Sequence, residues 1–176
     1  MNIDSKKSDV RTATRARLVA VFNDLLLAEE APRPKVARII AQANISRSTF
    51  YDYFDGVEEL LNESLAGLMG EIAKALIEEN PSRELSWYFD HIWQNRARAR
   101  DIFSGARGER VEALLVRQFE LRLAERSNRK LLAILAAGTV IAALRNWVRG
   151  NVAGSPEILA GKIERTITMV LAASEK

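Results

Sequence analysis

The sequence predicts an all-α protein, and three observations favour this fold class. Apolar residues recur at spacings of three and four in almost every long segment, which is typical of amphipathic helices. No run of alternating polar and apolar residues indicates a strand. Proline and glycine stand between the periodic segments, at points where helices end. With 176 residues, 48% of them hydrophobic, the chain can bury a substantial core.

The first part of the chain predicts three helices. A first helix is expected to stop at "AEEAPRP", and its apolar stripe is Leu18, Val21, Phe22, Leu25 and Leu26. Pro34 is expected to be the first residue of a second helix, whose stripe is Val36, Ile39, Ile40 and Ala43. Ser46 is a favoured N-cap, so we expect a short third helix that begins there and does not pass Phe54.

The rest of the chain predicts five longer helices. Asp55 and Glu58 form a D-x-x-E capping pattern that opens the fourth helix. Asn80 and Pro81 restart a fifth helix, which is expected to continue as far as "SGARG". The last three helices are expected over residues 109–125, 127–150 and 155–171. We expect a domain boundary on the fourth helix, between an amino-terminal unit of residues 1–62 and a carboxy-terminal bundle of residues 63–176.

The composition offers few groups for catalysis or metal binding. Cysteine is absent, His91 is the only histidine, and no glycine-rich phosphate loop or carboxylate–histidine cluster occurs. We therefore expect no enzyme, no metal site and no cofactor. The amino terminus lacks the apolar stretch of a signal sequence, and no run of about eighteen apolar residues occurs. A cytoplasmic protein with no membrane contact is expected.

Basic residues are concentrated ahead of the first apolar stripe. The net charge of the chain is only +3, but from Lys6 to Arg17 five basic residues stand against one acid, Asp9. Such an arm suits a polyanionic partner, and a solvated tail explains it equally well.

The segment "ANISRSTFYDYF", residues 43–54, combines two phenylalanines with two tyrosines. Phe50 and Phe54 are four residues apart and are expected to anchor the third helix in a core made by Leu18, Phe22, Ile40 and Leu61. Arg47, Ser48 and Tyr51 would then share the outward face. An exposed helix face of this kind fits the DNA major groove, where arginine reads guanine and hydroxyl groups read base edges. Alternatively, Tyr51 and Tyr53 only pack their rings at the rim of the core.

The same region resembles the TetR family of transcriptional regulators. The resemblance covers roughly residues 14–61, in "TRARLVAVFNDLLL" and "VARIIAQANISRSTFYDYFDGVEELL", with the pattern S-x-x-T-F-Y-x-x-F at its centre. The segment "AAGTVIAALRNWVRGNVAGSPEILAGKIERTI" is similar to the last two helices of the family. The resemblance implies a helix-turn-helix unit, a homodimer on a near-palindromic operator, and repression that ends when a small-molecule effector binds the carboxy-terminal bundle.

The resemblance also implies roles for individual residues. Bases would be contacted by Arg47 and Ser48, with Thr49 nearby and Ser46 at the start of the same helix. Phosphates would be contacted by Tyr51 and Tyr53, with Arg15 and Lys35 close to the DNA backbone. The sequence departs from the family pattern in three places. Asn44 replaces the usual glycine of the turn, and Val57 replaces a frequent lysine that would contact phosphate. Ahead of the second helix, Ala31 replaces a common glycine, and Pro34 and Lys35 replace common threonines.

The carboxy-terminal helices carry more apolar surface than one chain needs to hide. Periodicity alone leaves packing within the chain as an alternative to a dimer interface. The family resemblance implies an interface that includes Leu135, Ile141, Leu144, Val148, Ile163, Ile167 and Val170. An effector cavity between the middle helices is expected from an aromatic group with one histidine: Trp87, Tyr88, His91, Phe103 and Phe119. A single histidine near aromatic rings is more often a structural or exposed residue than a ligand contact. The arginine-rich run "NRARARDIFSGARGER" is explained as a solvated helix end and loop, or as a contact for an acidic effector or a phosphate.

Two classes of function remain at this stage. The first is a dimeric DNA-binding regulator, which the amino-terminal pattern favours. The second is a helical dimer that senses a ligand or a protein without binding DNA, which the modest charge and Val57 leave open. Salt dependence separates them, because DNA binding releases counterions from the contacted phosphates.

Overall fold

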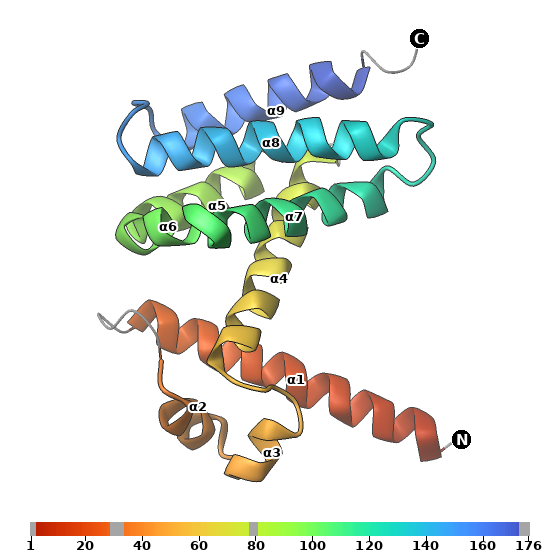
Figure 1. The fold of residues 1–176 in the computed structure, drawn as a ribbon, viewed down its shortest axis with the longest axis vertical. Coiled ribbons are helices and arrows are strands. Elements are labelled where there is room, and N and C mark those ends of the chain that lie inside the picture. The colour runs from red at the N-terminus through yellow and green to blue at the C-terminus, as the bar shows by residue number, and fades with distance from the viewer. Residues whose placement is uncertain (1–2, 29–33, 78–80, 173–176) are drawn as a thin grey trace. The chain divides into compact units, whose positions relative to one another are not determined.

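The computed structural model describes residues 3–28, 34–77 and 81–172. Over these residues the chain forms nine α-helices and no strand, so the predicted all-α class is confirmed (Figure 1). The helices are α1 (Ile3–Ala28), α2 (Val36–Ala43), α3 (Arg47–Tyr51), α4 (Val57–Ile77), α5 (Pro81–Gln94), α6 (Arg96–Ile102), α7 (Gly105–Arg122), α8 (Arg129–Val148) and α9 (Pro156–Ala172).

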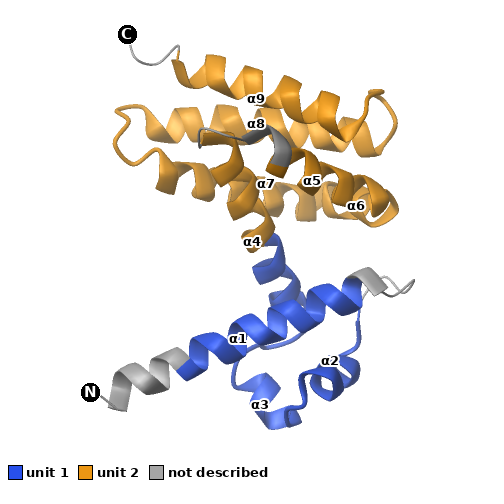
Figure 2. Ribbon diagram, turned by 180° about the vertical axis from the view of Figure 1, so that it is seen from behind, with its two compact units in different colours: residues 1–65 blue, residues 66–176 orange. Residues whose placement is uncertain are grey.

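The chain divides into two compact units, Met1–Leu65 and Ala66–Lys176 (Figure 2). The boundary falls within α4, between Leu65 and Ala66. The helix α4 therefore contributes its first turns to the first unit and its later turns to the second.

The first unit is built around the aromatic anchors that follow Ser46. Phe50 and Phe54 are 0% and 1% exposed. Around them are buried Leu18, Phe22, Leu25, Ile39, Ala43, Leu60 and Leu61. Ile39 takes the core position that the sequence analysis gives to Ile40, which is only half-buried. Burial of one such side chain stabilises the fold by about 1.5–3 kcal/mol, so Phe50 can hold a five-residue helix that would not form by itself.

Two helix starts in this unit differ from expectation. The helix α2 begins at Val36, and Lys35 is its N-cap with φ −80° and ψ 146°, so Pro34 lies before the helix and not at its first position. At the start of α4, the Asp55 N–H donates to Oε2 of Glu59 at 2.7 Å. Glu59 thus accepts from the Asp55 backbone, and the helix begins at Val57, one residue later than the D-x-x-E pattern suggests.

The second unit packs α5, α6 and α7 on one side of the α8–α9 pair (Figure 1). The closest helix pairs are α7 with α8, α5 with α9, and α8 with α9. Trp147 of α8 is fully buried, its ring stacks on Trp93 at 4.6 Å, and its Nε1–H donates to Gly154 O at 2.9 Å. Gly150 ends α8 with φ +81°, as the sequence predicts.

The middle helices are divided differently from the prediction. Two helices replace the expected fifth helix, because the chain breaks at Asn95 (φ −102°, ψ 24°), whose side-chain amide donates to His91 O at 3.0 Å. The next helix begins at Gly105 and ends at Arg122, earlier at both ends than the expected 109–125. Asn128 is the N-cap of α8, and Pro156 opens α9. The proposed cap Asn80 lies outside the described residues.

The helix α8 is long and apolar enough, by length and composition, to cross a membrane, with a mean hydropathy of 1.8. Half of its apolar window is buried inside the protein. A central packing helix gives the same pattern, because its neighbours cover its apolar side chains.

Candidate nucleic-acid interface

The turn between α2 and α3 holds a non-glycine residue in the left-handed region. Asn44 has φ 49° and ψ 53°. Its N–H donates to Ala41 O at 3.2 Å, and the Ile45 N–H donates to Ile40 O at 3.1 Å. Asparagine adopts this conformation more readily than most residues. The turn therefore forms with asparagine at the position where the family resemblance leads us to expect glycine.

The first turn of α3 is fixed by hydroxyl groups. The Thr49 N–H donates to Ser46 Oγ at 3.0 Å, so Ser46 is the N-cap that the sequence predicts. The hydroxyl of Ser46 also lies 2.8 Å from Ser48 Oγ and 2.8 Å from Thr49 Oγ1. Thr49 is half-buried, whereas Ser46 and Ser48 are exposed. Ser46 and Thr49 thus hold the helix start, and Ser48 presents a hydroxyl group to solvent.

The outward face of α3 carries Arg47, Ser48 and Tyr51, which are all exposed. Tyr51 is 45% exposed although the neighbouring Phe50 is fully buried, and the two rings meet edge to face at 5.3 Å. The Arg47 guanidinium lies 5.6 Å from the centroid of the Tyr51 ring, and its Nη2 is 3.5 Å from the Tyr51 hydroxyl. A cation and a phenol therefore sit side by side on a helix that is anchored from behind.

Arg11 joins this surface, although it is not among the residues that the family resemblance places near DNA. Its Nη2 donates to Asp52 O at 3.4 Å, and its guanidinium lies 5.7 Å from the centroid of the half-buried Tyr53 ring. The basic stretch of residues 6–17 is the sequence feature that points to Arg11. Only the fold places it beside the residues that follow α3.

Arg15 is partly exposed, and its guanidinium is bound by groups of the same unit. Its Nε donates to Glu63 Oε2 at 2.6 Å, its Nη1 donates to Tyr53 O at 2.8 Å, and Glu59 pairs with it at 3.4 Å. The hydrogen bond to Glu63 raises the pKa of Arg15 above its ordinary value, and burial opposes this only in part. The two carboxylates offset the positive charge of the Arg15 guanidinium, so Arg15 would attract a phosphate only weakly. Its geometry favours a positioning role over the expected DNA contact.

Lys35 lies at the start of α2, and Val57 lies at the start of α4. Lys35 is exposed at the N-cap of α2, where its ammonium can reach solvent. Val57, the first residue of α4, is half-buried and carries no charge.

The predicted effector residues are not gathered around one cavity. Phe103 and Phe119 are core residues, 2% and 0% exposed. Trp87 is 63% exposed, stacks on His91 at 5.9 Å, and lines a surface pocket together with Tyr88. The five predicted residues therefore do not line one internal cavity. Within the described part of the chain, no group of three or more His, Cys, Asp or Glu side chains is placed to hold a metal ion.

Most of the predicted interface residues are buried within the chain itself. Exposures are 0–3% for Ile141, Leu144, Val148, Ile163 and Ile167, so these five belong to the core and cannot meet a partner. Val170 is half-buried and Leu135 is 48% exposed. The apolar residues that α8 leaves uncovered are Leu131, Ile134 and Leu135, and those of α9 include Ile158 and Met169. Five of the seven residues that the family resemblance places at an interface are therefore core residues of the chain itself.

Comparison with known proteins supports the fold. No protein-family model matches the sequence, and no curated protein matches it. Similar solved structures include a TetR transcriptional regulator from Streptococcus agalactiae 2603V, with TM-score 0.54 and 21% identity over 93% of this chain and 98% of that one. A protein from Syntrophomonas wolfei that is assigned to the TetR family aligns with TM-score 0.55 and 15% identity, over 94% and 97% of the two chains.

A third similar structure is the dihydroxyacetone kinase operon activator DhaS, with TM-score 0.54 and 22% identity over 92% of this chain and 96% of that one. At these identities the comparisons establish the fold. The chain has the fold of TetR-family transcriptional regulators, along almost its whole length.

Proposed function

We propose that this protein is a dimeric, DNA-binding transcriptional regulator that reads a near-palindromic operator with one α3 from each subunit. The observation that carries the proposal is the exposed face of α3, where Arg47, Ser48 and Tyr51 lie opposite the fully buried Phe50. The major groove accepts a helix, and arginine donates two hydrogen bonds to guanine O6 and N7. Arg47 and Ser48 would contact bases.

Phosphate contacts would fix the position of α3 on the duplex. We assign them to Tyr51, Tyr53 and Lys35, and we add Arg11, which lies beside Tyr53. Such contacts position a protein and contribute affinity without specifying sequence. Arg11 also supplies a cation to a surface in which Val57 provides none.

A second copy of the chain is the partner that we propose for the uncovered apolar face of α8 and α9. Leu131, Ile134 and Leu135 follow helical spacing, and Gly138 and Ala142 continue the same face with small side chains that allow close approach. A palindromic operator would match a symmetric dimer whose two α3 helices lie about one turn of DNA apart, or 34–36 Å.

The direction of regulation depends on where the operator lies. The family resemblance favours repression that an effector relieves, whereas DhaS, one of the similar structures, is named as an operon activator. A reporter placed behind the selected operator decides between the two. The proposal involves no catalytic step.

The test is selection of bound duplexes from a random pool, followed by anisotropy titration of the best duplex at several salt concentrations. We expect a near-palindrome and a steep loss of affinity with salt, because each neutralised phosphate contributes about −0.9 to the slope of log K against log salt. Arg47→Ala should relax preference at one position of each half-site, at a cost of about 1–3 kcal/mol. Tyr51→Phe should weaken binding to all sequences alike.

The matched control is Arg117→Ala, which removes an exposed arginine from α7 in the second unit. It should leave affinity and preference unchanged. If a folded dimer enriches no sequence, the protein is either a sensor that does not bind DNA or a regulator that needs its effector before it binds DNA. If Arg47→Ala keeps both affinity and preference, then α3 is not the reading helix.

A further inference from the structure

A surface pocket of about 390 Å³ lies between α4 and α5 in the second unit. Glu71 and Lys74 line it from α4, and Glu84, Trp87 and Tyr88 line it from α5. Its volume falls within the range of about 300–1,000 Å³ that small-molecule sites occupy. The lining combines aromatic rings with two carboxylates.

Trp87 is the unusual member of this lining. It is 63% exposed, whereas Trp147 is fully buried and Trp93 packs on Trp147. The Trp87 ring is supported by an edge contact with Tyr88 at 5.1 Å and by stacking of His91 at 5.9 Å with 14° between the planes. An indole held in place by two neighbours and still mostly open to solvent adds little to the core. The face of an indole attracts cations more strongly than any other side-chain ring.

The charges around Trp87 favour a cation. Among the described residues that line the pocket, two are carboxylates, Glu71 and Glu84, and one is an ammonium, Lys74. Burial raises the pKa of the Tyr88 phenol, and the negative charges of Glu71 and Glu84 raise it further. Because a phenolate is disfavoured next to these carboxylates, a positive group in the same place would be favoured.

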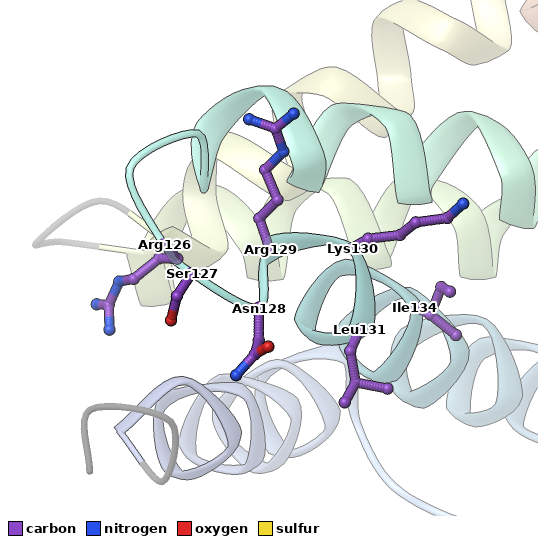
Figure 3. Close-up of a pocket in the computed structure, with 7 residues that line it drawn as sticks. All are labelled: Arg126, Ser127, Asn128, Arg129, Lys130, Leu131 and Ile134. Atoms are coloured by element: carbon purple, nitrogen blue, oxygen red, sulfur yellow. The ribbon is translucent and has the colours of Figure 1, made fainter.

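A second surface pocket, in the same unit, is lined by positively charged side chains. It has a volume of about 650 Å³ and is lined by Arg126, Ser127, Asn128, Arg129, Lys130, Leu131 and Ile134. Figure 3 shows the charged ends of Arg126, Arg129 and Lys130 pointing in three different directions. These cations do not converge on one point where an anion would bind. The pocket beside Trp87 therefore has the better-defined ligand chemistry.

We propose that the pocket between α4 and α5 binds an organic cation, whose charged group lies against the open face of Trp87 with Glu71 and Glu84 as counter-charges. The cation is either a free small molecule or the arginine or lysine side chain of a protein partner. This site is independent of the proposed DNA contacts, because all its residues belong to the second unit.

The experiment is isothermal titration calorimetry of the full chain, without DNA, so its result does not depend on whether the protein binds an operator. The probes are benzyltrimethylammonium, N-acetylarginine amide, and benzenesulfonate as the anionic counterpart. We expect at least one cation to bind and benzenesulfonate not to bind. Stronger binding of benzyltrimethylammonium indicates a free ligand, whereas stronger binding of N-acetylarginine amide indicates a side chain of a partner.

Single substitutions test whether the cation binds at Trp87 and Glu84. Trp87→Ala should weaken the better cation about tenfold, and Trp87→Phe by less, because phenylalanine keeps an aromatic face with a weaker attraction for cations. Glu84→Gln should weaken it several-fold without removing any ring. Glu109→Gln, at an exposed carboxylate on α7, is the matched control and should change nothing.

Any one of three results overturns the proposal. The first is that neither cation binds at about 10 mM, which corresponds to a binding free energy weaker than about 3 kcal/mol. The second is that benzenesulfonate binds as well as the cations, and the third is that affinity is unchanged in both Trp87→Ala and Glu84→Gln. Circular dichroism of each variant verifies that it is folded. If Trp87→Ala does not fold, Glu84→Gln still decides the outcome.

Discussion

Arg15 of α1 donates through Nε to Oε2 of Glu63 in α4 at 2.6 Å, across 48 positions of the chain. The same guanidinium donates to Tyr53 O at 2.8 Å and lies 4.4 Å from the centroid of the Phe54 ring. The segment that leaves α3 is therefore fastened to α1 and to the first turns of α4 by one side chain. If α3 reads DNA, these contacts of Arg15 are needed to hold the helix in a single orientation.

Replacing Arg15 should lower stability more than it alters phosphate binding. For Arg15→Met we expect a loss of about 1–2 kcal/mol, since several charge-assisted hydrogen bonds disappear at a partly exposed site. Arg15→Lys should recover part of this, because lysine keeps the charge but lacks the planar fork. Urea denaturation of the full chain measures both. A phosphate contact would instead show as a decrease of about 0.9 in the salt slope of DNA binding, which we do not expect.

At the left-handed turn, replacing Asn44 by alanine should lower stability more than replacing it by glycine. Asn44 has φ 49°, where a residue with a Cβ and no compensating polar group costs about 1–2 kcal/mol. Asn44→Ala should therefore destabilise the protein by about 1 kcal/mol, and Asn44→Gly should be neutral or stabilising. Thermal denaturation compares the two with Gln42→Ala, at an exposed position of α2 with no such constraint. Equal melting temperatures for Asn44→Ala and Asn44→Gly would contradict this account.

Local patterns predicted the structure of residues 46–54 well. The Ser46 cap, the Phe50 and Phe54 anchors and the outward placement of Arg47 depend on residues within a few positions of one another. Spacing decides such relationships directly, because residues three and four apart share a helix face. The roles of these residues in DNA recognition stay predictions.

Long-range relationships could not be predicted from the same patterns. Arg15 is a basic residue in a basic arm, and nothing near it in sequence indicates that Glu59 and Glu63 neutralise it. Similarly, Ile141 and Ile167 lie on apolar stripes, and a stripe has the same spacing whether its own chain or a partner covers it. The break at Asn95 was missed because the apolar spacing continues across it from Ile92 to Ala99.

The turn between α6 and α7 leaves no room for a side chain at Gly108. A Cβ there would lie 2.7 Å from the carbonyl carbon and oxygen of Phe103, which are backbone atoms and cannot swing away. We expect Gly108→Ala to destabilise the protein by about 1–3 kcal/mol, through forced backbone movement. Gly67→Ala, in α4, is the matched control, because no atom lies within 4 Å of a Cβ built there. Urea titration should show the two variants differing in midpoint, and similar midpoints would exclude the close approach as a constraint.

The uncovered face of α8 should control the oligomeric state. Leu135 is 48% exposed on the proposed interface, so Leu135→Glu would place a charge where a second copy is expected to bury an apolar side chain. We expect Leu135→Glu to be a folded monomer by sedimentation equilibrium. Leu121→Glu changes an equally apolar, 63% exposed residue on α7 and should remain dimeric. Should both variants stay dimeric, the interface lies on another surface.

Alkaline titration tests the charge environment around Tyr88. Burial, followed by the charges of Glu71 and Glu84, raises the pKa of Tyr88 above its ordinary value of 10.0. A folded-state pKa above the unfolded value means that the native state holds the proton more tightly, so this contribution to stability is complete below pH 10 and is lost as the pH rises through the folded-state pKa. In tyrosinate absorbance, Tyr88→Phe should remove an ionisation step above pH 10, and Glu71→Gln should shift that step to lower pH. If Glu71→Gln leaves the step unmoved, then Glu71 does not contribute to the potential at this phenol, and the case for a cation beside Trp87 loses one of its two counter-charges.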